Sequence, residues 1–238
     1  MGPSLEGYKS FVQCQIRCSE KDTKRGGDKA PRPFVTISRQ TGAGGITVGL
    51  LLVEYLNKND KAATCPWTVF DKDLVKQVLE TQNLPKEFEK FMEERKTPEM
   101  RDIMETLIEL HPPAFALVRR TSETILQLAQ MGQSVIVGRG GNVITWKLKG
   151  GIHVRIIGSI EKRIKHTADY YGLTHKEAEK QLREDDKGRK EYLKQNFNKD
   201  IDDPLLYDLT LNTDHISYQS AAKIIGDALL SSWVAEKV

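Results

Sequence analysis

Long apolar stretches are missing from this sequence. No apolar run approaches the about 20 residues that a membrane-spanning helix needs. Residues 1–6 lack the basic segment and the following apolar segment of a secretory signal. We therefore expect a cytoplasmic protein with no membrane partner.

Cysteine is scarce as well. The 238 residues include three cysteines, which are too few for a disulfide framework. Cys14 and Cys18 are four residues apart and could share one face of a helix, but no second pair of ligands follows nearby to complete a zinc site. The sequence therefore predicts buried or half-buried thiols rather than a metal centre.

A strong charge of either sign is also missing. The formal net charge is +3, so charge does not indicate a nucleic-acid partner. Apolar residues make up 39% and charged residues 29% of the chain, as in ordinary globular proteins. The length suits one α/β domain with an inserted lobe, or at most two small domains.

Short β-rich runs alternate with helical patterns from residue 33 onward, which predicts an α/β fold with a five-stranded parallel sheet between two layers of helices. Strands are expected at 34–37, 68–70, 134–137, 152–157 and 207–211. Helices are expected at about 46–56, 71–81, 86–96, 98–110, 113–131, 160–171, 174–195 and 217–235. Residues 84–132 carry no strand signal, so they form a helical insertion in this interpretation.

The first 32 residues stand apart from this pattern. Residues 5–18 have apolar side chains at helical spacing, and residues 19–32 are polar and rich in Gly and Lys, which is typical of a flexible linker. The helix would dock on the core, on a partner or on a second copy of the chain, so a homodimer through this helix is one expectation.

A glycine-rich turn separates the first strand from the next helix. Inward-facing amides of such a turn, with the helix N-terminus, form an anion site. The generic pattern G-x-x-x-x-G-K-[ST] fails here, because Arg39 stands at the first glycine, Gly45 at the lysine and Ile46 at the Ser/Thr. A simple turn is therefore an alternative, unless Arg39 supplies the missing charge. The residues expected around the phosphates are Gln40, Thr41, Gly42, Ala43, Gly44, Gly45, Ile46 and Thr47, with the Thr47 hydroxyl toward Mg²⁺.

Two other strand ends carry polar candidates. Asp71 follows the second strand, where it could orient a substrate or a metal-bound water, or cap the next helix. Arg139 lies between Gly138 and Gly140 after the third strand, where a guanidinium suits an acceptor phosphate; an ordinary surface turn is the alternative.

Residues 36–45, Thr-Ile-Ser-Arg-Gln-Thr-Gly-Ala-Gly-Gly, resemble the I-S-R-x-x-G-[SA]-G-G signature of the cytidylate kinase-like family, which typically lacks the loop lysine. Residues 70–75, which include Asp71 and Lys72, and residues 207–213 are similar to two further family segments. The family's relatives read G-R-D where this chain has Gly140 after Arg139. The resemblance covers about residues 33–230 in order, and it implies a P-loop NTPase of nucleoside-monophosphate-kinase architecture with an acceptor-binding helical lobe at 84–132 and a lid at 160–196.

The charged run from 161 to 192 resembles the arginine-bearing lid of these kinases. Solvated helices with i,i+4 pairs are the alternative interpretation. The lid residues expected to contact the reacting phosphates or the acceptor are Arg163, Arg183, Asp186, Lys187 and Arg189.

The resemblance implies a phosphotransferase that uses ATP and Mg²⁺ on CMP, dCMP or a related small phosphorylated acceptor. In this hypothesis Arg39, Arg163, Lys187 and Arg189 are catalytic. The substrate-binding set is Asp71, Lys72, Arg139, Arg183 and Asp186. Gly140 leaves open a kinase of another metabolite, and the missing lysine leaves open a nucleotide-binding sensor without turnover.

Overall fold

The computed structural model describes residues 5–24, 32–71, 73, 102–103, 105–106 and 116–231. The helices predicted at 71–81, 86–96 and 98–110 lie largely outside these residues. The described elements are α1 (Leu5–Lys24), β1 (Phe34–Arg39), α2 (Gly45–Asn59), β2 (Thr68–Phe70), α6 (Ala116–Met131), β3 (Ser134–Val137), α7 (Gly141–Ile144), β4 (Gly151–Ile157), α8 (Ile160–Tyr171), α9 (His175–Phe197), the 3₁₀ turn η2 (Pro204–Leu206), β5 (Leu209–Asn212) and α10 (Tyr218–Leu230).

The centre of the molecule is a five-stranded parallel sheet in the order β2-β3-β1-β4-β5, which confirms the predicted fold class. β1 lies between β3 and β4, with Ile37 level with Val137 on one side and Val154 on the other. Because both faces are covered, these strands are almost wholly buried and read as apolar runs in the sequence. The carboxyl ends of β1 and β3 therefore open side by side on one edge of the sheet.

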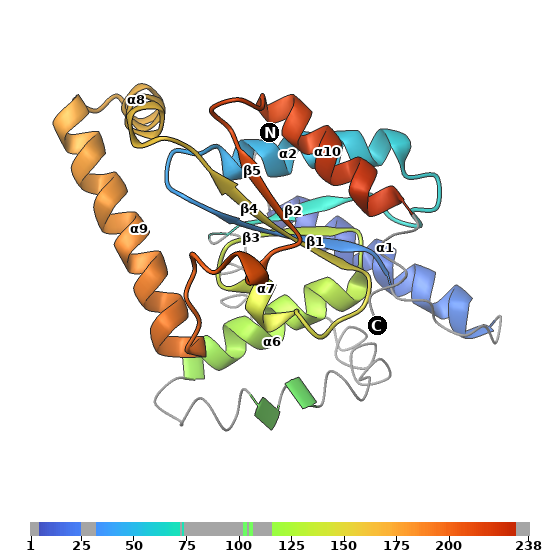
Figure 1. The fold of residues 1–238 in the computed structure, drawn as a ribbon. Helices are drawn as coiled ribbons and strands as arrows, with labels where there is room; N and C mark the ends of the chain where they lie inside the picture. Colours follow the sequence, from blue (N-terminus) through green and yellow to red (C-terminus); the bar gives the residue numbers. More distant parts are fainter. Residues whose placement is uncertain are drawn as a thin grey trace.

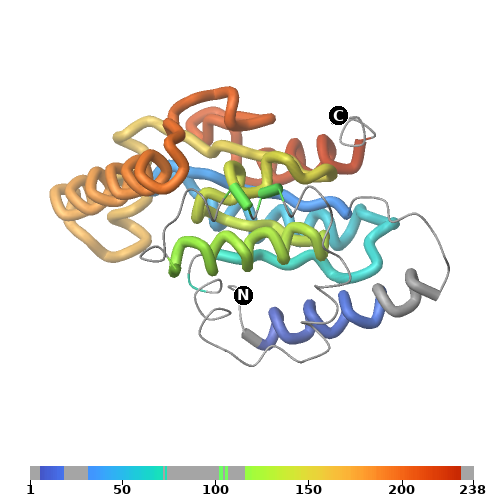
Figure 2. Tube along the Cα trace, turned by 90° about the horizontal axis from the view of Figure 1, so that it is seen from below, coloured from blue at the N-terminus to red at the C-terminus, as the bar shows by residue number. Residues whose placement is uncertain are grey.

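Helices cover the two faces of the sheet separately (Figure 1). On one face α2 and α10 pack together, and Val48, Leu52 and Ile225 are fully buried there. On the other face α1, α6, α7 and the end of α9 share a core around Phe34 and Phe70. Figure 2 shows α6 and α1 on this second face and the α8–α9 pair projecting beyond the sheet. Among the described helices, none combines the length and apolar character that crossing a bilayer requires.

The N-terminal helix is longer than its sequence pattern predicts. α1 continues to Lys24, so the predicted linker at 19–32 is wrong for its first six residues. Residues 19–24 contain no Gly or Pro, and the helix-breaking glycines come only at Gly26 and Gly27. The apolar face of α1 is buried in the chain's own core through Tyr8, Phe11 and Val12.

The expectation of buried or half-buried thiols is wrong for two of the three cysteines. Cys14 and Cys65 form a disulfide across 51 residues, with Cα atoms 5.9 Å apart, and Cys18 is free. Sequence spacing around α1 could not reveal this pair, because Cys65 arrives from the segment that leads into β2. The fold brings that segment against α1.

Candidate active site

The glycine-rich loop connects β1 to α2 and ends in an uncapped helix start. Gly42 has φ 77° and Gly44 φ 81°, in the left-handed region that favours glycine. Gly44 is the N-cap of α2, and no side chain caps the helix. No side chain of the described residues therefore accepts from the first amides of α2, which is the arrangement that binds anions at a helix N-terminus.

The same glycines also let neighbouring elements approach the loop closely. A Cβ at Gly42 would overlap the carbonyl oxygen of Arg163 in α8, and one at Gly44 would overlap the ring of Tyr218 in α10. A Cβ at Gly45 would come within 2.8 Å of the Arg39 side chain. The loop is thus enclosed by α8 on one side and by α10 on another.

Gly42→Ala is expected to lower the free energy of unfolding by about 2–3 kcal/mol, because it adds a clash with the backbone of α8 to the cost of a positive φ. Gly172 is the matched control, since its φ is +65° and no atom lies within 4 Å of its added Cβ. Gly172→Ala should cost only about 1 kcal/mol. Urea unfolding of both variants measures the difference, and equal losses would show that the contact with α8 does not constrain the loop.

Arg39 leaves the end of β1 and runs between the loop and the turn after β3. Its aliphatic part lies against Gly45 and its guanidinium lies against Gly138. A side chain at either glycine would displace the Arg39 side chain. Burial, then repulsion by Arg189, Arg139 and Arg155, lowers its pKa to about 10, and Asp71 partly offsets this. Arg39 therefore stays charged at neutral pH.

Arg139 occupies a turn in which three consecutive residues are left-handed. Its φ is 54°, between φ 92° at Gly138 and φ 71° at Gly140. A non-glycine residue in this region costs about 1 kcal/mol or more, and such strain gathers at functional sites. The strain holds the exposed Arg139 side chain over the carboxyl end of β3.

A cavity of about 370 Å³ lies between these strand ends and α9. We call it the arginine cavity. Its polar and charged lining includes Ser38, Arg39, Arg139, Asn142, Arg189 and Tyr192, together with the carboxylates Glu184 and Asp185 of α9. The three arginines outnumber the two carboxylates, so the cavity suits an anionic ligand.

Asp186 joins α9 to the loop. Its carboxylate accepts from the Thr41 amide at 2.7 Å and the Thr41 hydroxyl at 2.8 Å. It also pairs with Arg163 at 2.6 Å and Arg189 at 3.0 Å. Arg163 is only 7% exposed and further donates to the carbonyl oxygens of Thr41 and Gly158. A carboxylate with two arginine partners thus occupies a loop amide that could otherwise bind phosphate.

A family model described as the cytidylate kinase-like family matches residues 34–215. That stretch includes the glycine-rich loop, the turn at Arg139, and the helices α8 and α9. The chain belongs to the cytidylate kinase-like family. The resemblance drawn from the loop sequence is confirmed, and family membership supports a function of the nucleotide-kinase type.

Two solved structures illustrate the likeness of fold. An uncharacterized protein from Eubacterium ventriosum is 21% identical, with a TM-score of 0.65 over 83% of this chain and 98% of that one. Shikimate kinase from Acinetobacter baumannii, in complex with shikimate, is 19% identical, with a TM-score of 0.45 over 85% and 96%. None of the curated proteins matches this chain. The similarity to the Eubacterium ventriosum protein supports the fold and says nothing of the activity.

The structure brings only part of the predicted family site together. Arg39, Arg139 and Arg189 line the arginine cavity, whereas Arg163 and Asp186 lie at the loop beside it. Lys187 pairs with Glu191 and Arg183 with Glu179, both as largely exposed i,i+4 pairs along α9. In this conformation Lys187 and Arg183 therefore behave as the surface charges of a solvated helix, which was the alternative interpretation of the charged run.

The remaining predicted residues lie around the loop. Ile46 and Thr47 are exposed in the first turn of α2, and Ala43 is buried. Gln40 accepts a bond from the Gly158 amide, which ties the loop to β4. Asp71 accepts from the Asp73 amide at 3.1 Å, the pattern expected of a helix cap. Lys72 lies outside the described residues.

A buried arginine that the sequence analysis missed lies next to the cavity. Arg155 is 5% exposed in β4, donates to Ser38 at 2.9 Å and pairs with Asp202 at 3.3 Å. The Tyr207 hydroxyl donates to the carbonyl oxygen of Ile201 at 2.8 Å, and it lies 3.4 Å from the Ser38 hydroxyl. An arginine between Val154 and Ile156 in an apolar strand was the available signal, because buried charges require partners.

Proposed function

We propose that this chain is an ATP-dependent phosphotransferase that moves the γ-phosphate of ATP to CMP, dCMP or a related small phosphorylated acceptor. One observation carries the proposal: Arg39, Arg139 and Arg189 converge on one cavity beside the uncapped start of α2. Phosphoryl transfer requires little beyond positioning and stabilisation of negative charge, and this site offers both.

Each group has a distinct task in this proposal. The loop amides and Arg39 hold the donor phosphates, and Arg139 holds the acceptor phosphate. An acceptor oxygen attacks the γ-phosphorus, the bond to the bridging oxygen breaks, and ADP leaves while Arg39 and Arg189 stabilise the transferring group. The attacking phosphate is already anionic, so no general base is needed; none of the described residues that line the cavity is a histidine.

The chain offers oxygen donors that suit Mg²⁺. The Thr47 hydroxyl is exposed at the start of α2, and the Asp71 carboxylate is half-buried at the end of β2, close enough to act on the charge of Arg39. Hydroxyl and carboxylate oxygens are the ligands this hard cation prefers. When bound, Mg²⁺ would neutralise charge on the donor phosphates.

A second candidate is a nucleotide-binding protein without turnover. Gly45 stands where the bridging lysine of related kinases lies, and Asp186 holds the Thr41 amide. Both features weaken donor binding in the lid position seen here. A kinase of another metabolite is also consistent with Gly140, which replaces a residue that would contact the acceptor's sugar or base.

An ADP-release assay with ATP and Mg²⁺ against a panel of nucleoside monophosphates tests the proposal, together with calorimetric titration of ATP and CMP. Turnover with CMP or dCMP well above the ATP-only rate is expected. Binding of ATP without turnover on any acceptor would favour the sensor. Absence of nucleotide binding would show that the loop is only a turn.

Arg139→Ala is expected to raise KM for the acceptor by about 100-fold and to leave KM for ATP nearly unchanged, since it removes a phosphate partner on the acceptor side. Alanine has the same backbone preference against positive φ, so the turn strain is similar in both proteins. Steady-state kinetics with each substrate varied measures the split. A parallel rise in both KM values would contradict an acceptor-specific role.

A further inference from the structure

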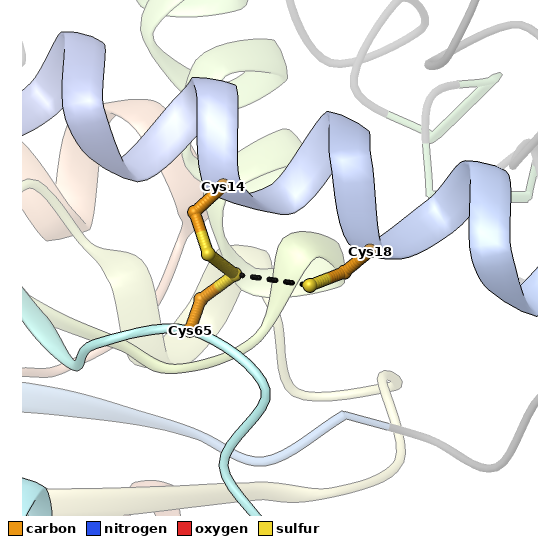
Figure 3. Close-up of side chains that lie close together, drawn as sticks. All are labelled: Cys14, Cys18 and Cys65. Carbon is orange, nitrogen blue, oxygen red and sulfur yellow. Dashed lines mark hydrogen bonds between the residues drawn. A yellow bond between two sulfur atoms is a disulfide. The ribbon is translucent and has the colours of Figure 1, made fainter.

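All three cysteines of the chain meet at one place, far in sequence from the loop residues. Cys14 and Cys18 lie one turn apart on α1, and Cys65 lies in the segment before β2 (Figure 3). Their sulfur atoms are all within 4.8 Å of one another, and Cys18 Sγ is 3.5 Å from Cys65 Sγ. The three sulfurs therefore form a compact triangle.

A disulfide accounts for only two of these sulfurs. The bond joins Cys14 and Cys65, yet Cys18 is held against it with its thiol 3.6 Å from the Thr64 carbonyl oxygen. A structural cross-link between α1 and the segment before β2 does not require a third thiol in contact with it. Three converging sulfurs are what a thiophilic metal ion requires.

We propose that, in the reduced chain, Cys14, Cys18 and Cys65 bind one Zn²⁺ ion as three thiolates, with water in the fourth position. Zn–S bonds of about 2.3 Å around a tetrahedral ion place its sulfur ligands about 3.8 Å apart. The observed triangle needs only the S–S bond to be absent and small side-chain rotations to reach this spacing. Binding releases the three thiol protons, so the affinity for the ion rises with pH.

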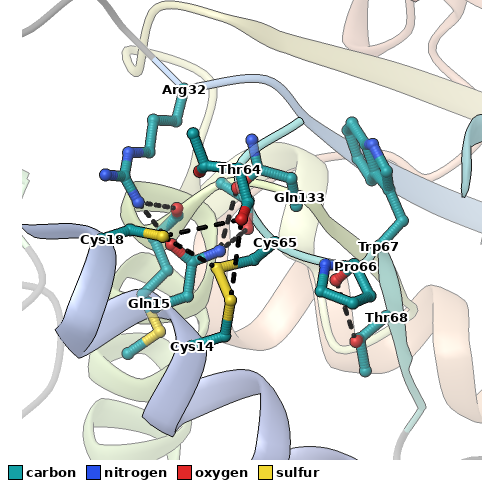
Figure 4. Close-up of a disulfide and its surroundings, with 12 residues drawn as sticks. Cys14, Gln15, Cys18, Arg32, Thr64, Cys65, Pro66, Trp67, Thr68 and Gln133 are labelled. Carbon is teal, nitrogen blue, oxygen red and sulfur yellow. Dashed lines mark hydrogen bonds between the residues drawn. A yellow bond between two sulfur atoms is a disulfide. The ribbon is translucent and has the colours of Figure 1, made fainter. Parts of the chain in front are cut away.

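The surroundings make this position a structural junction. On the N-terminal side of the cysteines, α1 packs Tyr8 and Phe11 edge-on against Phe70 of β2. Gln15, which is fully buried, donates to Gln133 at 2.9 Å just before β3 (Figure 4). An ion at the cluster would therefore lock α1 to the strands whose ends carry Asp71 and Arg139.

The test uses the full-length chain, reduced and freed of metal under anaerobic conditions, then titrated with Co²⁺ and Zn²⁺. We expect one Co²⁺ per chain with strong sulfur-to-cobalt charge-transfer absorption, displacement by one Zn²⁺, and protection of all three cysteines from alkylation. Because the chain has no other cysteine, any thiolate signal comes from this cluster.

Cys18→Ser is the decisive variant, because it removes one of the three proposed ligands and keeps Cys14 and Cys65, which form the disulfide of the oxidised chain. It is expected to weaken Zn²⁺ binding by more than about 100-fold. Gln13→Ala changes an exposed neighbour on the same helix and should bind like the wild type. Unchanged Zn²⁺ affinity in Cys18→Ser, or no stoichiometric metal in the reduced wild type, would overturn the proposal and leave a disulfide with a bystander thiol.

Discussion

Arg39→Met is expected to lower kcat/KM for phosphoryl transfer by about 1,000-fold while leaving the ligand-free protein at least as stable as the wild type. The activity falls because the Arg39 side chain lies against Gly45, the position of the missing lysine. Its charge would take the place of the lysine's charge beside the donor phosphates. The stability does not fall, because Arg39 is a cation beside Arg189, Arg139 and Arg155, and its lowered pKa shows that its charge is disfavoured in the unliganded fold.

Two measurements separate these effects. Thermal unfolding without ligand should give Arg39→Met a midpoint at or above that of the wild type, and the stabilisation added by ATP should disappear. Arg120→Ala, which removes an exposed arginine on α6, serves as the control and should change neither value. Retained ATP stabilisation in Arg39→Met would show that Arg39 does not replace the lysine.

Asp186→Asn is expected to lower the free energy of unfolding by about 2 kcal/mol, because the buried Arg163 loses its charged partner. The bond to Arg163 is 2.6 Å long, and the Arg163 side chain is 9% exposed. The same change should loosen α9 from the loop, since the carboxylate also holds Thr41 and Arg189.

Glu179→Gln on the same helix is the matched control. Glu179 pairs with Arg183 at 2.7 Å, a nearly equal distance, but the arginine is 63% exposed. Solvent screening limits such a pair to well under about 1 kcal/mol. Urea unfolding should therefore separate the two variants clearly. Equal losses would mean that Asp186 contributes only as an ordinary surface charge.

Much of the fold could be predicted from local pattern. β1, β3 and β4 are buried on both faces, so each appears in the sequence as a short apolar run between turns. α7 was missed because it is four residues long and begins from the left-handed turn at Gly140, where no periodicity can develop. The end of α1 was missed because polar residues without Gly or Pro look like a linker.

The site was predictable where a motif marks a strand end. Arg39 and Arg139 follow β1 and β3, so a parallel sheet had to bring them to one edge. The contacts of Arg163 with Thr41, of Arg155 with Asp202 and of Cys65 with Cys14 depend instead on which elements meet across the fold. These partners are 122, 47 and 51 residues apart in sequence. A single sequence carries no record of those distances.

The most direct test of the central claim follows the γ-phosphate itself. Purified chain is mixed with γ-labelled ATP, Mg²⁺ and CMP or another monophosphate from the panel, quenched within one turnover and separated. We expect the label to appear in the nucleoside diphosphate with the wild type, and to remain in ATP with Arg39→Met. Label that stays in ATP, or passes only to inorganic phosphate, with every acceptor would contradict the account.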